Sequence, residues 1–240
     1  MMRFDHDKRH ARTRLALLAG LVLLPLASVA RDDAWGDDPW ASENVSPWSW
    51  YGFVEGAAGV RTDDNPLIDE DMPLGELRLQ VEGEYKGDGA TWDFKLDGIA
   101  DGVEDDFTGN VREAKVSFTL GERTDVRAGR QILTWGTGDL VFLNDLFPKD
   151  WVSFLSGRDR EYLKAPSDAV RTSWFGENVN VDVALLPFRE PDVYIDGTRL
   201  SYWNPGAGSR VAAPPKLRTT EPARTVENSE AALRVYGMAG

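Results

Sequence analysis

Cysteine is absent from the 240-residue sequence, and the only two histidines, His6 and His10, stand close to the N-terminus. Without cysteine there is no disulfide framework and no thiolate chemistry. Past residue 10 the chain also lacks the histidine that Ser-His-Asp hydrolysis, Cys-His catalysis and His-based metal sites require. Carboxylate pairs are the remaining route to acid–base chemistry, and the sequence does not fix the separation of any pair. We therefore expect no enzyme activity, no cofactor and no metal site.

Positive charge and long apolar runs are also scarce. Lys and Arg number 27 against 40 Asp and Glu, which gives a net charge of -13. A nucleic-acid partner is not expected, because phosphate binding needs a basic surface. Outside the N-terminal region no apolar run approaches the roughly 20 residues of a membrane-spanning helix. At 42% hydrophobic residues, the chain is nevertheless apolar enough to fold.

The N-terminus has the parts of an export signal. A basic segment, 3–14, precedes an apolar run, 15–26, and Ala30 closes a small-residue cleavage motif. We expect residues 1–30 to be a cleaved signal peptide, residues 31–47 a periplasmic leader, and residues 48–240 the folded domain. An uncleaved anchor is the alternative, but the apolar run is short and Pro25 interrupts it.

After the leader the hydrophobic period becomes two. In residues 77–85, the apolar side chains Leu77, Leu79 and Val81 alternate with polar ones. Strict alternation is typical of a half-buried β-strand. The pattern recurs in 92–97 and 111–120, and more weakly in 51–61, 123–133, 169–175, 179–187 and 229–239. The sequence predicts an all-β fold of about eight strands, each near the roughly 9–11 residues with which a tilted strand crosses a bilayer.

The predicted connections alternate between short and long. Short ones fall at 86–89, 121–123 and 176–178, and long ones at 62–73, 101–110, 134–168 and 188–228. Short periplasmic turns and long extracellular loops are typical of an antiparallel transmembrane β-barrel. Aromatic residues near strand ends fit its interface belts: Trp50, Tyr51, Tyr85, Trp92, Trp135, Trp174 and Tyr236. A soluble secreted β-sandwich also alternates apolar and polar residues, and stays open as an alternative.

If the apolar residues face lipid, the polar residues that alternate with them line a lumen. This predicted lining carries both signs of charge on neighbouring strands: Glu55, Glu76, Arg78, Gln80, Glu82, Glu84, Asp93, Lys95, Asp97, Glu113, Lys115, Asp125, Arg127, Arg171, Asp182 and Arg234. Rows of acids and bases can discriminate permeating solutes by charge. The alternative for any one residue is a cross-strand ion pair that stabilises the wall.

The stretch from 127 to 151 is both irregular and apolar, and it follows the fifth predicted strand. We expect it to leave the strand and fold over or into the lumen as a constriction. The residues assigned to that constriction are those with turn-forming, aromatic or charged side chains: Trp135, Gly136, Asp139, Asn144, Asp145, Pro148 and Asp150.

Several short motifs in this region carry a family resemblance: Gly129-Arg130-Gln131, Trp135-Gly136, Asp139, Asn144-Asp145 and Pro148-Lys149-Asp150. Together they resemble a pattern of outer-membrane porin-like proteins, namely the alginate-export family and related proteobacterial barrels. The resemblance spans residues 129–175 and implies an outer-membrane channel for an anionic polysaccharide or another small solute. The resemblance implies an arginine-rich lumen, as in the alginate exporters. The predicted lining here is instead mixed and net acidic, and this departure disfavours an anionic polymer as the solute.

Acidic clusters in two predicted loops offer a second kind of site: Asp63, Asp64, Asp69, Glu70 and Asp71, then Asp101, Glu104, Asp105 and Asp106. Clustered carboxylates can hold Ca²⁺ or Mg²⁺ and bridge lipopolysaccharide. The DxDxDG spacing of a calcium loop is missing, so we expect solvated loops.

The sequence thus predicts a porin-like channel for passive passage of small polar solutes in the outer membrane of a Gram-negative bacterium. The expected partners are outer-membrane lipid, lipopolysaccharide and the barrel assembly machinery. A non-channel barrel with a structural or adhesive role is the alternative. The last residues, 236–240, lack the terminal aromatic typical of such barrels, so we expect the N-terminal part of a larger barrel.

Overall fold

The computed structural model describes residues 46–62, 65–68, 71–136, 145–195, 197–212 and 222–237. The predicted signal peptide, residues 1–30, and nearly all of the predicted leader, residues 31–47, lie outside the described residues, so both assignments stay predictions.

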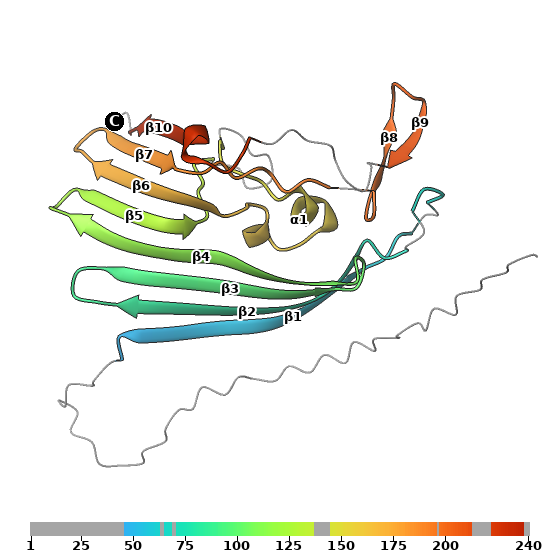
Figure 1. Ribbon diagram of the computed structural model, residues 1–240, viewed down its shortest axis with the longest axis horizontal. Coiled ribbons are helices and arrows are strands. Elements are labelled where there is room, and N and C mark those ends of the chain that lie inside the picture. The colour runs from blue at the N-terminus through green and yellow to red at the C-terminus, as the bar shows by residue number, and fades with distance from the viewer. Residues whose placement is uncertain are drawn as a thin grey trace, which may run out of the picture. The chain divides into compact units, whose positions relative to one another are not determined.

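Eight antiparallel strands form one sheet, in the order β1-β2-β3-β4-β5-β6-β7-β10. Figure 1 shows them side by side in this order. Their bounds are β1 Trp48–Gly59, β2 Leu74–Lys86, β3 Thr91–Asp101, β4 Asp106–Leu120, β5 Thr124–Gln131, β6 Ser167–Phe175, β7 Asn180–Leu186 and β10 Glu230–Tyr236. The predicted all-β, antiparallel fold is confirmed, and β1 and β10 are the two ends of the strand order.

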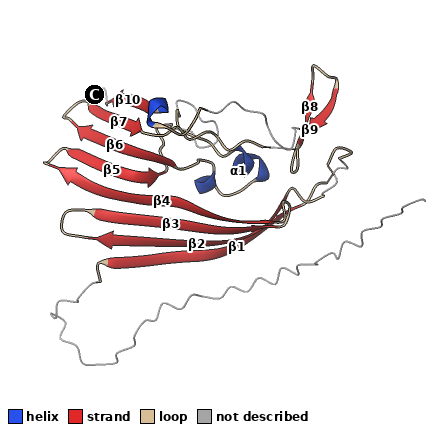
Figure 2. Cartoon of the chain, viewed as in Figure 1, coloured by secondary structure: helices blue, strands red, loops and turns tan. Residues whose placement is uncertain are grey.

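Helices are few and short, as Figure 2 shows. They are α1 (Trp151–Ser156) and the 3-10 turns η1 (Arg160–Tyr162) and η2 (Val226–Asn228). Asp150 begins α1 by accepting a hydrogen bond from the Ser153 N–H at 2.8 Å, and Gly157, at φ 81°, ends it. Among the described residues no helix is both long and apolar enough to cross a membrane.

The connections differ from the predicted pattern in two places. The predicted long loop at 101–110 is wrong, because β3 and β4 pair up to Asp101 and Asp106 and leave a tight turn between them. The Asp101 carboxylate closes that turn by accepting the Val103 and Glu104 N–H groups at 2.9 and 3.2 Å. Within the predicted loop 188–228, the structure adds a hairpin of β8 (Ser201–Asn204) and β9 (Ser209–Ala212).

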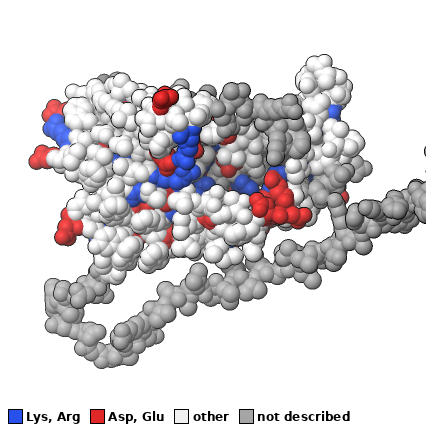
Figure 3. Space-filling view, viewed as in Figure 1, with Lys and Arg blue, Asp and Glu red and all other residues white. Residues whose placement is uncertain are grey.

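The sheet exposes its apolar side chains and buries its polar ones. In β2, Leu77 and Leu79 are 55% and 49% exposed, whereas Arg78 and Gln80 are 3% and 0% exposed. We call the face with Arg78 and Gln80 the inner face, and the face with Leu77 and Leu79 the outer face. Soluble proteins show the reverse distribution, since they bury apolar side chains and leave charges in water. Figure 3 shows large uncharged areas on either side of a charged band, with further charged groups at the edges of the view.

A small apolar core also lies on the inner face. The strand β5 ends at Gln131, and the chain that follows buries Leu133 and Trp135 against Phe147 and the β6 and β7 side chains Ala169, Ala184 and Leu186. The Trp135 ring meets Phe147 edge-on, with the ring centroids 5.0 Å apart. The prediction that Trp135 lies in a membrane-interface belt is therefore wrong, because the chain leaves the sheet before it.

Gly129 in β5 provides a test of the strand pairing. Its φ is +121°, and a Cβ at this position would overlap the carbonyl oxygen of Ala114 in β4. Gly129→Ala should therefore lower the free energy of unfolding by about 2–3 kcal/mol or more. The matched control is Gly109→Ala in β4, where a Cβ meets nothing within 4 Å. Urea unfolding in detergent micelles measures both variants, and equal stability of the two would contradict the described β4–β5 pairing.

Candidate functional site

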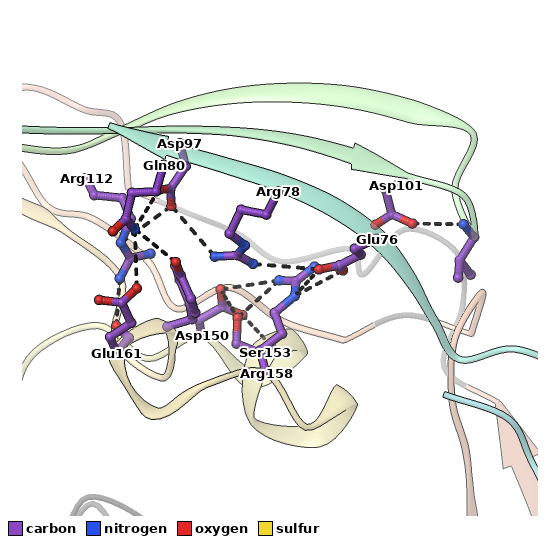
Figure 4. Close-up of polar contacts among 12 residues, drawn as sticks. Glu76, Arg78, Gln80, Asp97, Asp101, Arg112, Asp150, Ser153, Arg158 and Glu161 are labelled. Atoms are coloured by element: carbon purple, nitrogen blue, oxygen red, sulfur yellow. Dashed lines mark hydrogen bonds and ion pairs between the residues drawn. The ribbon is translucent and has the colours of Figure 1, made fainter. Parts of the chain in front are cut away.

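The candidate site is a cluster of buried charges on the inner face, where the segment 145–166 docks onto β2, β3 and β4. We call Glu76, Arg78, Gln80, Asp97 and Arg112 the polar cluster; their exposed fractions are between 0% and 8%. Figure 4 shows these side chains directed toward one another and toward Arg158, Asp150 and Glu161 of the docked segment. Buried charges are costly unless they are paired, so the partners of each one matter.

Strand alternation and one bulge bring the polar cluster together. Arg78 lies 3.6 Å from Glu76 and 3.7 Å from Asp97, and Gln80 donates to Asp97 at 2.8 Å. Arg112 falls where the register of β3 and β4 shifts between Lys95 and Leu96. The extra residue of a β-bulge re-aims a side chain, and here the Arg112 guanidinium comes within 3.7 Å of Asp97.

Tyr162 of η1 anchors the docked segment in the polar cluster. Its ring lies between two guanidinium groups, with the carbon of Arg78 at 3.4 Å and that of Arg112 at 4.7 Å from the centroid. Its hydroxyl accepts a hydrogen bond from Gln80 at 2.9 Å. Cation–π contacts gain strength where water is excluded, and Tyr162 is only 2% exposed.

Arginines from the connecting segments complete the ion pairs. Arg158, just after α1, makes hydrogen bonds of 3.0 Å from Nε to both carboxylate oxygens of Glu76. Arg199, far along the chain, pairs with Asp101 and with Glu104, the latter at 2.9 Å, and donates to the Pro73 carbonyl at 3.2 Å. Forked guanidinium contacts of this kind fix geometry as well as charge. The inner face therefore holds residues that are distant in sequence.

The register places the predicted lining residues of neighbouring strands opposite one another. Lys95 stands across from Glu82 and from Glu113, and Arg127 stands across from Arg171. Directly opposed residues of antiparallel strands share a face. Their contacts include Lys95–Glu82 at 2.9 Å, Lys115–Asp93 at 3.8 Å, Glu84–Lys86 at 2.9 Å, Arg171–Asp182 at 2.9 Å, Thr119–Asp125 at 2.9 Å and Arg234 over the Tyr236 ring at 4.4 Å. That this shared face surrounds a lumen stays a prediction.

The residues predicted to form a constriction are divided in the structure. Asp145 is buried between Lys149 and Lys164, 3.5 Å from each, and Asp150 caps α1. The Pro148 carbonyl accepts the Ala165 N–H at 3.1 Å, so this stretch is folded and hydrogen-bonded. Trp135 and Gly136 belong to the chain that enters the inner face, and Asp139 and Asn144 lie outside the described residues.

Sequence reasoning missed Arg112, Arg158, Tyr162 and Arg199. A signal existed for Arg112: the apolar residues Val111 and Ala114 are three positions apart, and a bulge is needed to keep both on the outer face. The other three come from connections, where no periodicity indicates which way a side chain points.

The electrostatics of the site favour charged, paired groups. Burial acts to raise the pKa of Glu161, but the hydrogen bond with Tyr162 and the charge of Lys95 outweigh it, so that pKa is lowered. Burial acts to lower the pKa of Arg158, but its contact with Glu76 outweighs that effect and the pKa is raised. No group of three or more acidic or histidine side chains within the described ranges is arranged to hold a metal ion. The polar cluster and the docked segment together can keep paired, charged side chains at fixed positions along the inner face.

No protein-family model matches this sequence, and neither does any curated protein.

Substitution of Tyr162 tests how much the docked segment depends on this side chain. Tyr162→Ala should lower the free energy of unfolding by about 3–5 kcal/mol, because it leaves a cavity between two guanidinium groups. Tyr162→Phe keeps the ring and loses the hydrogen bonds of the hydroxyl with Gln80 and with Glu161, at a cost of about 1–2 kcal/mol. Chemical unfolding in micelles distinguishes them. If Ala and Phe were equally costly, the ring between the arginines would not be the anchor.

The lowered pKa of Glu161 predicts an acid-sensitive contribution to stability. A carboxyl with a lowered folded-state pKa stabilises the fold above its unfolded-state pKa, and that contribution disappears as the pH falls through the folded-state value. Unfolding midpoints should therefore fall on acidification from neutral pH, with a smaller fall in Glu161→Gln. An identical pH profile for the variant would exclude Glu161 as a contributor.

Proposed function

We propose that residues 48–240 form wall strands of an outer-membrane β-barrel of porin type, which lets small polar solutes pass along its inner face. The observation that carries this proposal is the inverted burial of the sheet, with exposed leucines on one face and buried charges on the other. A bilayer is the solvent in which such an outer face is favourable. The inner face, by contrast, needs water or polar partners.

Aromatic side chains on the outer face support the membrane placement. Trp48 and Trp50 stack with centroids 5.4 Å apart, and Trp48 lies 4.9 Å from Tyr85. Trp92 and Trp174 lie at the same end of the sheet, beside the turns that follow β2 and β6, and are 46% and 43% exposed. Barrels carry aromatic girdles at the level of the lipid headgroups, so this end is the periplasmic boundary in our proposal.

The inner face suits small polar solutes of either charge. Acidic and basic side chains alternate across β2, β3 and β4, and the docked segment narrows the space above them through Arg158 and Tyr162. Mixed rows of charge select by field and size, without the strong preference that a single sign would give. The docked segment is then the constriction, with lipopolysaccharide and lipid outside the wall and the assembly machinery as the partner during insertion.

The eight described strands do not pair into a closed ring. The edges of β1 and β10 have no strand partner within the residues the structure describes. An unpaired edge in lipid costs several kcal/mol for each unsatisfied backbone group. In the proposed barrel, further strands cover these two edges and complete the wall.

A non-channel barrel is the second candidate, favoured by one observation. Charges that could serve a pathway are used in ion pairs with the docked segment, and Asp97 and Arg78 retain almost no exposure. A plugged barrel of this kind would act through its exposed surface, where Tyr202 and Trp203 of β8 are 51% and 61% exposed.

Insertion and conductance test the proposal together. Leu79→Arg puts a charge on the outer face and should cost about 2–4 kcal/mol of insertion free energy at the bilayer midplane. The control is Tyr51→Arg, an exposed position on the inner face that stands across from Glu82. Folding into liposomes is followed by the change in gel mobility on heating, and only Leu79→Arg should fail to fold.

Conductance tests the channel itself. Wild-type protein in planar bilayers should give stepwise ion currents; insertion without such currents would favour the plugged barrel.

A further inference from the structure

The described strands leave part of the β4 edge open. Strand β4 has 15 residues and β5 only 8, and their pairing begins at Ala114 and Arg130. Within the described residues, the first part of β4, residues 106–111, has no partner strand on its β5 side, and every residue in it is exposed. The Arg130 Nε donates to the Val111 carbonyl at 2.8 Å and so satisfies one acceptor of this open edge.

A charged cavity of about 980 Å³ adjoins the open edge. Its lining includes inner-face residues, such as Arg112 and Arg158, and also Thr108 and Val111 from the open edge of β4. It also includes Asp168, which alternates in β6 with Ala169 of the inner core and so belongs to the opposite face. The cavity is thus lined by residues of both faces, and Figure 3 shows a band of charged atoms across the middle of the view, with further charged groups at its edges.

Four charged side chains form a neutral quartet at this opening: Arg130, Arg224, Asp168 and Glu190. Arg130 lies 3.3 Å from Asp168 and 3.4 Å from Glu190, while Arg224 lies 2.6 Å from Glu190 and also pairs with Asp168. The group is partly open to solvent, since the Arg224 side chain is 53% and the Asp168 side chain 30% exposed. A ligand with one anionic and one cationic group can exchange with these pairs and leave no charge unpaired.

An apolar groove of about 410 Å³ is formed by the same chain segments as the quartet. Val170 follows Asp168 by two residues on the same face of β6, Val226 follows Arg224 by two, and Leu185 of β7 stands across from Val170. Val170, Leu185 and Val226 are 40%, 51% and 66% exposed. An exposed apolar groove beside a charge cluster fits a molecule with a polar head and an apolar chain.

We propose that the opening between β4 and β6 binds a zwitterionic amphiphile, with its phosphate and ammonium groups on the quartet and its acyl chain in the apolar groove. This inference rests on the proposed membrane placement of the outer face. The phosphate replaces the carboxylates as the partner of Arg130 and Arg224. The ammonium group then pairs with the carboxylates of Asp168 and Glu190.

Native mass spectrometry of the full chain, released from neutral maltoside micelles, tests the site. Lysophosphatidylethanolamine is titrated against lysophosphatidylglycerol of the same acyl chain, which carries only negative charge. The zwitterionic lipid should bind more tightly. Arg130→Gln should weaken it about tenfold, because one charge-assisted hydrogen bond is worth about that factor, and Leu185→Gln should weaken both lipids. The matched control is Arg123→Gln, an exposed arginine whose Glu177 partner is 3.8 Å away at the opposite turns, and it should bind as wild type.

Two results would overturn the proposal: equal or tighter binding of the anionic lipid, or equal binding by Arg130→Gln and Arg123→Gln. If Arg130→Gln fails to fold by circular dichroism, Asp168→Asn replaces it and should abolish the preference for the zwitterion. The titration needs no ion passage, so loss of the channel function in bilayers would contradict the proposed function and leave this test intact.

Discussion

The buried charges of the inner face depend on partners from elsewhere in the chain, and this requirement organises the structure. Glu76, Arg78 and Asp97 cannot be left unpaired at a few per cent exposure, because a buried charge without a partner costs several kcal/mol. The docked segment meets that need through Arg158, which forks onto Glu76, and through Tyr162, which lies between guanidinium groups. The short helix α1, its Asp150 cap and the turn at Gly157 serve to aim Arg158.

The two faces of the sheet then impose opposite demands on their surroundings. Leucines, valines and tryptophans stand outward from β1, β2 and β3, where water would be unfavourable. The second half of the sheet is built differently, because β5 ends early and sends Leu133 and Trp135 inward to the apolar core. One consequence is good packing beside Ala169 and Ala184; the other is an open edge on β4. The early end of β5 therefore produces both the apolar core and the proposed amphiphile site.

Much of the sheet could be predicted from the sequence, since period-two alternation at Leu77–Leu79–Val81 marks both strand and face. The three-residue spacing of Val111 and Ala114 marks a break in that alternation, but it does not show that the extra residue, Arg112, contacts Asp97, because that contact depends on the partner strand β3. The acidic residues of the turn at Asp101 also suit a long solvated loop, and only the hydrogen bonds from the Val103 and Glu104 N–H groups to Asp101 distinguish the two. Arg158, Tyr162 and Arg199 were beyond prediction for a different reason: their positions follow from long-range pairing with β2 and β3.

Site-directed spin labelling tests most directly that the outer face is in contact with lipid. The absence of native cysteine allows single labels to be placed without background. Labels at Leu77, Leu79 and Val81 in liposomes should be accessible to oxygen and protected from a water-soluble nickel complex, and labels at Glu82 and Glu84 should show the opposite preference. Nickel accessibility at all of the leucine and valine positions, in folded and liposome-bound protein, would contradict the account.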